Sequence, residues 1–215
     1  MWYFINFLNP PCSNLIHMFF LLILSSQRLE PLMQIDQKSI KNKQRILIAG
    51  NQGTSEIIRI LKSILSTIGK SVDFWESTDE PDLTDAPVLI IDGGLLMAQN
   101  ALKLQDFNPH ILLIHQVEEQ YGGFSNFNEF VKEFEKLADS LPKAGTLIFN
   151  ESNDVAVLLG KKEREDVKNI EYSALDKGFT ASTDTNFLSS AGAARALLQR
   201  IGVSEEQLFA ALKKI

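Results

Sequence analysis

The sequence predicts an α/β protein of three layers, in which a mostly parallel sheet is flanked by helices. Two observations point to this class. From residue 45 onward, short apolar runs alternate with segments whose apolar residues recur at helical spacing. Several of the short runs are apolar throughout, which is typical of parallel strands buried on both faces.

The predicted strands are short runs rich in β-branched and aromatic residues. They cover residues 45–50 ("RILIAG"), 71–76 ("SVDFWE"), 88–92 ("VLIID"), 110–115 ("HILLIH") and 145–150 ("GTLIFN"). The acidic, proline-bearing segment 79–87 predicts a surface loop. The charged segment 161–169, "KKEREDVKN", predicts a solvated face or a loop.

Helices are predicted between these strands and at the end of the chain. The first follows residue 53 and ends at Gly69, and its apolar face is formed by Ile57, Ile60, Leu61, Ile64, Leu65 and Ile68. A second covers 127–141, with a phenylalanine stripe that we assign to the core. A third covers 186 to about 200 and ends at Gly202. The last begins with a capping box of Ser204 and Gln207.

Composition narrows the classes of function. A chain of 215 residues suits one domain with a substantial core. The net charge of -6 leaves no basic surplus to neutralise phosphates, which argues against a nucleic-acid-binding protein. A single cysteine, Cys12, allows neither an internal disulfide nor a cysteine-rich metal cluster. We therefore expect a cytoplasmic protein.

Residues 1–32 differ from the rest, and we separate them as an apolar extension from a domain at 33–215. The first 27 residues contain no Asp, Glu, Lys or Arg, and the apolar run 15–24 is shorter than the about 20 residues that span a bilayer. Three interpretations compete: an atypical signal, a membrane anchor, or upstream sequence foreign to the functional protein. We favour the last, with Met33 as the true start, so membrane contact is expected only if residues 1–32 are genuine.

The segment 45–61, "RILIAGNQGTSEIIRIL", has the layout of a phosphate-binding loop. A loop between a strand and a helix N-terminus directs backbone N–H groups and a positive dipole at one point, and glycines let a phosphate approach closely. Gly50 and Gly53 suit that purpose, and Ser55 offers a hydroxyl to Mg²⁺. The lysine of such loops is absent, because Thr54 follows Gly53. An ordinary strand-to-helix turn is therefore the alternative.

Three stretches together are similar to the central domain of the Mur ligases, the ATP-dependent amide-forming enzymes of peptidoglycan synthesis. "ILIAGNQGTSE" resembles their strand and GTxGKT(S/T) loop, with Thr54 at the lysine position. Residues 108–154 resemble a longer signature that ends in "LPxxGxLIxNxDD". Residues 185–215 resemble the family's "HNxxNALAAxAxAxxLGV" ending, and Asn186 matches its first asparagine. The likeness covers residue 45 to the end, without the substrate domains of the ligases.

The resemblance implies ATP and Mg²⁺ as cofactors and assigns possible site residues. The candidate nucleotide-binding residues are Gly50, Asn51, Gln52, Gly53, Thr54, Ser55 and Asn186. Asp92 is the candidate metal ligand, and a solvated residue at a strand end is its alternative. For Asn186 a helix cap is the favoured alternative.

Other polar residues within the resemblance receive structural assignments. His115 stands where the family usually has asparagine, and we expect a buried histidine hydrogen-bonded in the core. Asn150 and Asp154 are expected to hold a turn. The family's acid-histidine segment is reduced to Glu118 and Glu119, without a histidine. Catalytic residues are not assigned.

The departures fall where ligation chemistry would occur. The leading hypothesis is therefore a stand-alone, degenerate Mur ligase central domain that binds ATP weakly or not at all and interacts with envelope-synthesis proteins. One alternative is an active ATP-dependent acid–amino-acid ligase fragment whose substrate domains lie on another chain. The other is a non-enzymatic, P-loop-like interaction module.

Overall fold

A computed structural model describes residues 36–77, 79, 81–98, 104–119, 126–162 and 164–213. The expected extension 1–32 and the "YGGFS" part of the family signature, residues 121–125, lie outside the described residues. Among the helices of the described ranges, none has the length and apolar content needed to span a bilayer.

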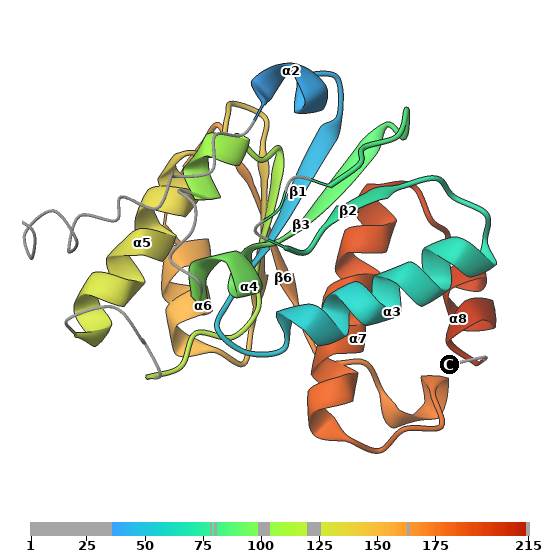
Figure 1. Cartoon of the computed structure of the whole chain (residues 1–215). Coiled ribbons are helices and arrows are strands. Elements are labelled where there is room, and N and C mark those ends of the chain that lie inside the picture. The colour runs from blue at the N-terminus through green and yellow to red at the C-terminus, as the bar shows by residue number, and fades with distance from the viewer. Residues whose placement is uncertain are drawn as a thin grey trace, which may run out of the picture. The chain divides into compact units, whose positions relative to one another are not determined.

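The described part of the chain contains a parallel sheet of six strands in the order β2-β3-β1-β4-β5-β6 (Figure 1). The strands are β1 (Gln44–Ala49), β2 (Asp73–Trp75), β3 (Val88–Asp92), β4 (Ile111–Ile114), β5 (Thr146–Asn150) and β6 (Lys168–Tyr172). All residues of β3, β4 and β5 are buried, as the continuous apolar runs predict for central parallel strands.

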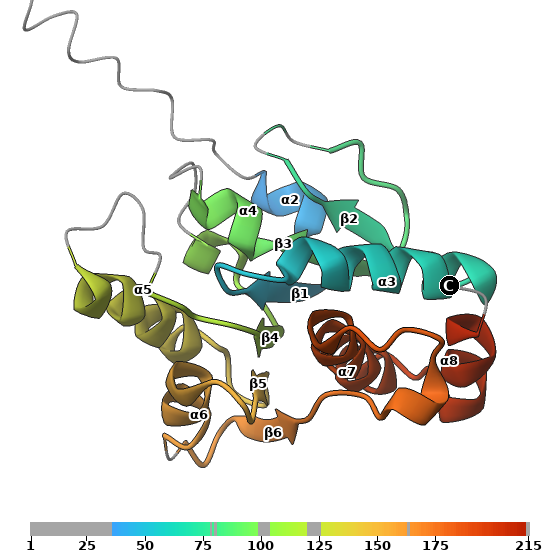
Figure 2. The same ribbon diagram turned by 90° about the horizontal axis from the view of Figure 1, so that it is seen from below.

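Helices cover both faces of the sheet, which confirms the predicted three-layer α/β class (Figure 2). One face carries α3 (Thr54–Thr67), α7 (Thr185–Arg200) and α8 (Glu205–Leu212). The other carries α4 (Gly93–Ala98), α5 (Phe127–Asp139) and α6 (Asp154–Gly160), with the short α2 (Gln37–Ile40) and the 3-10 turn η1 (Leu104–Phe107). A second 3-10 turn, η2 (Lys177–Phe179), precedes α7.

The hydrophobic core is divided into two layers by the alternation of side chains along each strand. In β1, Ile46 and Ile48 face α3 and α7, whereas Leu47 and Ala49 face the opposite layer. The phenylalanine stripe of α5 contributes the buried Phe130 and Phe134 to that second layer, as expected.

Some local details differ from the prediction. Residues 168 and 169, expected on a solvated face or in a loop, are exposed but open the edge strand β6, whose sequence is largely polar because an edge strand needs only one buried side. The strand expected at 71–76 is shorter, Asp73–Trp75. The short helices α2, at residues 37–40, and α4, which begins at residue 93, were not predicted.

The short edge strand β2 is attached to the sheet by a buried ion pair. The Nζ atom of Lys43 lies 2.8 Å from Asp73 Oδ2 and also donates to the carbonyls of Thr84 and Ala86. Burial alone would raise the pKa of Asp73, but hydrogen bonds from Lys43 and Thr84 bring it below its usual value. The charge of Lys43 is therefore neutralised inside the protein.

The chain order creates a topological switch beside β1. From β1 the chain moves to β2 and β3 on one side, and then crosses to β4, β5 and β6 on the other. Loops that leave neighbouring strands in opposite directions form a crevice at the carboxyl ends of the strands, where α/β proteins bind ligands. We call this side of the sheet the carboxyl edge and the opposite side the amino edge.

Replacement of Gly192 by alanine tests the packing of α7 on the sheet. Alanine normally stabilises a helix interior relative to glycine by about 1 kcal/mol. Here a Cβ atom would overlap Ser173 O and lie 3.1 Å from Ala174 Cα. We expect Gly192→Ala to lower the free energy of unfolding in urea by about 1–3 kcal/mol.

Gly178→Ala is the matched control, because a Cβ atom at Gly178 would meet no atom within 4 Å. Its effect should stay within about 0.5 kcal/mol. A Gly192→Ala variant as stable as the wild type would contradict the close contact.

Candidate functional site

The glycine loop, residues 50–55, connects β1 to α3 and requires both of its glycines. Gly50 has φ 148° and Gly53 has φ 78°, a region that glycine adopts without strain. A Cβ atom on Gly50 would lie 2.7 Å from Gln116 O, and one on Gly53 would lie 2.6 Å from His115 Nε2. The close approach that these glycines permit is therefore to the segment that follows β4, residues 115–118.

Hydrogen bonds fasten the glycine loop to segment 115–118. The Asn51 backbone N–H donates to Gln116 O at 2.9 Å, and the Asn51 side chain exchanges two hydrogen bonds with the backbone of Glu118. Gln52 Nε2 donates to the Glu118 carboxylate at 2.7 Å. The side chains of Asn51 and Gln52, expected to bind nucleotide, thus have partners within the protein.

Thr54 is directed into the protein. It is the first residue of α3 and is 5% exposed. Its side chain lies against Gly94 at the start of α4, where a Cβ atom would overlap Thr54 Oγ1 and come within 2.7 Å of Gly50 O. The residue at the lysine position of the loop therefore packs between two loops and offers no charge to a ligand.

Ser55 and Asp92 form a polar pair at the carboxyl edge. Ser55 Oγ, on an exposed residue of α3, donates to Asp92 Oδ2 at 3.1 Å. Asp92 ends β3 opposite Ile48 of β1 and is 2% exposed, so its interpretation as a solvated strand-end residue was wrong. A loop hydroxyl and a strand-end aspartate are the protein ligands that P-loop proteins give to Mg²⁺.

These two residues fit a magnesium ion that takes its remaining ligands from water and phosphate. Mg²⁺ commonly binds through only one or two carboxylates. Within the described ranges, no cluster of three or more His, Cys, Asp or Glu side chains could hold a metal.

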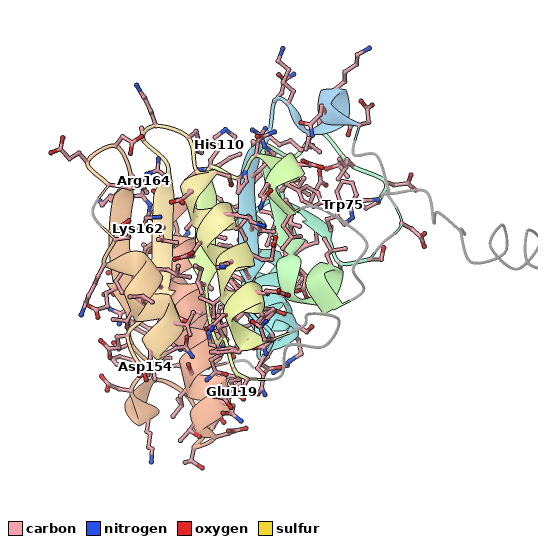
Figure 3. The ribbon with its side chains drawn as sticks, turned by 90° about the vertical axis from the view of Figure 1, so that its left-hand side faces the viewer. Trp75, His110, Glu119, Asp154, Lys162 and Arg164 are labelled. Atoms are coloured by element: carbon pink, nitrogen blue, oxygen red, sulfur yellow. The ribbon has the colours of Figure 1, made fainter. Side chains whose placement is uncertain are left out.

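Other charges near the glycine loop are negative or are already paired. Glu56, in the first turn of α3, is hydrogen-bonded to Arg59, which lowers the pKa of Glu56 against the effect of its partial burial and of the nearby Asp184. Lys62, two turns further on, pairs with Glu76. Figure 3 shows Glu119 and Asp154 towards the same end of the sheet. The charged side chains that these contacts place near the glycine loop are therefore negative or paired.

The side chain of His115 packs against the glycine loop. It is 1% exposed, and its Nδ1 atom lies 2.5 Å from the Tyr172 hydroxyl, with the two rings nearly parallel. Burial lowers the pKa of His115 to about 4, so the imidazole is neutral at pH 7. The prediction of a buried, hydrogen-bonded core histidine is confirmed.

The family motifs contain two asparagines with an expected structural role. The prediction for Asn150 is confirmed, and the prediction for Asn186 is wrong. Asn150 accepts a hydrogen bond from the Ser152 N–H and holds the expected turn. Asn186 does not cap α7, because Asp184 is the N-cap and accepts from the Asn186 N–H at 2.9 Å. Among the described residues, no hydrogen bond joins Asn186 to the glycine loop. Asp154 lies within α6, whose cap is Asn153.

Two residues of the site were not foreseen from the sequence. One is Gly94, which contacts the Thr54 side chain, although the Gly93–Gly94 doublet directly after a strand is a signal for close backbone approach. Tyr172, the partner of His115, ends the unpredicted strand β6.

Comparisons with known proteins bear on the fold. No protein-family model and no curated protein matches the sequence. Among solved structures, MurF from Acinetobacter baumannii superposes with a TM-score of 0.65 at 14% identity, over 83% of this chain and 47% of MurF. The fold is Mur ligase-like.

Two further solved structures have a similar fold. UDP-N-acetylmuramate:L-alanyl-gamma-D-glutamyl-meso-diaminopimelate ligase from Neisseria meningitides gives a TM-score of 0.63 at 12% identity, over 93% of this chain and 74% of the ligase. A murein peptide ligase from Psychrobacter arcticus gives 0.58 at 16% identity, over 80% of this chain and 47% of that ligase. The chain thus spans about half the length of two of these Mur ligases and about three quarters of the third.

The buried His115 makes stability depend on pH. The folded-state pKa of about 4 lies below the ordinary value of 6.5, so the unfolded chain binds more protons between these values. The contribution is complete above pH 6.5 and is lost as the pH falls towards 4, by up to about 3 kcal/mol. Urea unfolding at pH 7 and pH 4.5 measures this loss.

Replacement of His115 by asparagine separates this effect from the titration of carboxylates. His115→Asn should be less stable at pH 7, because it loses the bond to Tyr172, but its stability should fall less between pH 7 and 4.5. Equal losses in the two proteins would rule out His115 as the cause.

Proposed function

We propose that this chain is a Mur ligase central-domain-like protein that does not catalyse ligation and binds ATP weakly or not at all. The observation that carries the proposal is the inward position of Thr54. The proposal is also supported by charge. Asp92 and Glu118 contact the glycine loop, and both are carboxylates that would repel a phosphate group.

The reason is electrostatic. By resemblance to the Mur ligases, ligation requires transfer of a phosphoryl group from ATP to a carboxylate. Such transfers depend on cationic groups that stabilise the charge of the transition state. Thr54 supplies none, and the N–H group of Asn51 is bonded to Gln116 O rather than free for a phosphate.

Two residues that could bind a metal ion are nevertheless present. Ser55 and Asp92 would hold Mg²⁺, whose contribution in such sites is to neutralise phosphate charge. This pair favours a second candidate, an active ATP-dependent acid–amino-acid ligase fragment that is completed by substrate domains on a separate chain.

The proposal also covers the location of the protein and its partners. A Mur ligase-like domain without catalysis would act in the cytoplasm through envelope-synthesis proteins as partners. An interaction module unrelated to the cell wall is the remaining alternative, and a pull-down that recovers no envelope-synthesis protein would favour it.

Calorimetric titration with ATP and MgCl₂ tests the absence of a strong nucleotide site. We expect no binding, or a dissociation constant of about 1 mM or weaker. Micromolar, magnesium-dependent binding that is lost in Asp92→Asn would instead establish the second candidate.

Thr54→Lys restores the missing charge. If the glycine loop can still receive phosphates, the ammonium group should raise the affinity for ATP by about tenfold, the value of one charge-assisted hydrogen bond. Calorimetry with ATP and MgCl₂ measures the gain.

Thr67→Lys is the matched control, since Thr67 is exposed at the last turn of the same helix and the substitution adds the same charge. A gain confined to Thr54→Lys supports a phosphate-binding ancestry of the loop. No gain in Thr54→Lys, or equal gains in both variants, would mean that the glycine loop is purely structural.

A further inference from the structure

A hollow opens at the amino edge of the sheet, at the opposite end from the glycine loop. Its volume is about 500 Å³. It lies at the first residues of β1, β4 and β5, beside the last residue of α7. Its lining consists of Lys41, Asn42, Lys43, Gln44, His110, Ile111, Ala144, Thr146 and Arg200. We call it the basic hollow; Figure 3 shows His110 at this end of the molecule.

The basic hollow carries unbalanced positive charge. Its lining contains no carboxylate, and the charge of Lys43 is neutralised by Asp73. Lys41 and Arg200 remain, and neither forms an ion pair within the described ranges. Arg200 Nη2 donates to Thr146 Oγ1 at 3.0 Å, which leaves its other N–H groups and the Thr146 hydroxyl hydrogen available as donors.

The tautomer of His110 adds a further donor. The Arg45 backbone N–H donates to His110 Nδ1 at 3.1 Å, so Nδ1 carries no proton and the proton of the neutral ring is on Nε2. Arg45 Nη2 lies 3.4 Å from this Nε2 atom. Both nitrogens are then N–H donors, and His110, unlike Arg45, lines the basic hollow.

Several carbonyl groups at this edge that could repel an anion already accept hydrogen bonds. The carbonyls of Ile40, Lys41 and Lys43 at the end of α2 accept from Arg45 Nη1. The carbonyls of Leu197, Leu198 and Gln199 in the last turn of α7 accept from the backbone N–H groups of residues 201–203. These hydrogen bonds reduce the repulsion that an anion would meet at the two helix ends.

We propose that the basic hollow binds a phosphate dianion, either free or as the monoester of a small molecule. Two full positive charges match a dianion, and the guanidinium, ammonium, imidazole N–H and hydroxyl donors reach it from different sides. The volume exceeds that of phosphate alone and suits a ligand of cofactor or sugar-phosphate size. This site is independent of the glycine loop and of nucleotide binding there.

The test is a ¹H–¹⁵N NMR titration of the full chain with sodium phosphate and, separately, with ribose 5-phosphate. Sodium chloride at equal ionic strength serves as the reference. We expect saturable shifts at the Arg200 side chain and the His110 ring, with a dissociation constant on the order of 1 mM or tighter. Saturation by both phosphates, or by either, supports the site. Shifts that grow linearly, or that chloride reproduces, would overturn it.

Variants assign the binding to named residues. Arg200→Gln and Lys41→Gln should each weaken phosphate binding about tenfold or more. Lys136→Gln, on the exposed surface of α5, removes the same charge elsewhere and should leave binding unchanged. Equal effects of all three would indicate non-specific attraction and reject the proposal.

The backbone signal of Gly53 separates this result from the proposed function. Phosphate bound at the glycine loop would shift Gly53, whereas phosphate bound in the basic hollow should not. Saturable shifts at Gly53 alone would refute the basic hollow. If Arg200→Gln fails to fold, as judged by its spectrum, Lys41→Gln on the exposed end of α2 carries the test.

Discussion

Strand β1 is the element on which the rest of the structure depends. It is buried on both faces and hydrogen-bonded to β3 on one side and β4 on the other. The pairing fixes its register, so that Ile48 lies opposite Asp92 and Ala49 lies opposite Ile114. The glycine loop must therefore leave the sheet beside Asp92 and His115, whatever chemistry follows. Packing and pairing of the buried strands are therefore enough to fix the position of the glycine loop at the carboxyl edge.

The core does not determine what this edge binds. A fold shared with Mur ligases fixes the position of the carboxyl edge, whereas individual side chains decide what it binds. Ser55 and Asp92 are compatible with Mg²⁺, but Thr54 and Glu118 give no attraction to phosphate. At the amino edge, Arg200 and Lys41 form no ion pair within the described ranges. The two ends of the sheet thus differ in the sign of the charged side chains that lie there.

Much of the fold could be predicted from the sequence because its central strands are apolar throughout. Runs such as "VLIID" and "HILLIH" can only be stable inside a layered core, and the structure places them there. The polar edge strand β6 gave no such signal. Its formation follows from pairing with β5, a contact between segments about 20 residues apart.

The contacts of the candidate site were less predictable than the fold. Gly50 and Gly53 were expected to let a phosphate approach closely, whereas in the structure they let segment 115–118 approach. The direction of the Thr54 side chain depends on Gly94, about 40 residues away, which periodicity cannot reveal. The cap of α7 was misplaced by two residues, since Asp184 and Asn186 are both good capping residues in sequence.

The glycines at the carboxyl edge also have a mechanical consequence. A Cβ atom on Gly94 would lie 2.7 Å from Gly50 O, and one on Gly50 would lie 2.7 Å from Gln116 O. The glycine loop therefore approaches the start of α4 on one side and segment 115–118 on the other, backbone to backbone, and the Thr54 side chain fills the space beside Gly94. Contacts this close leave little room for one segment to shift alone. We therefore expect local opening of the glycine loop to disturb the packing of both neighbours.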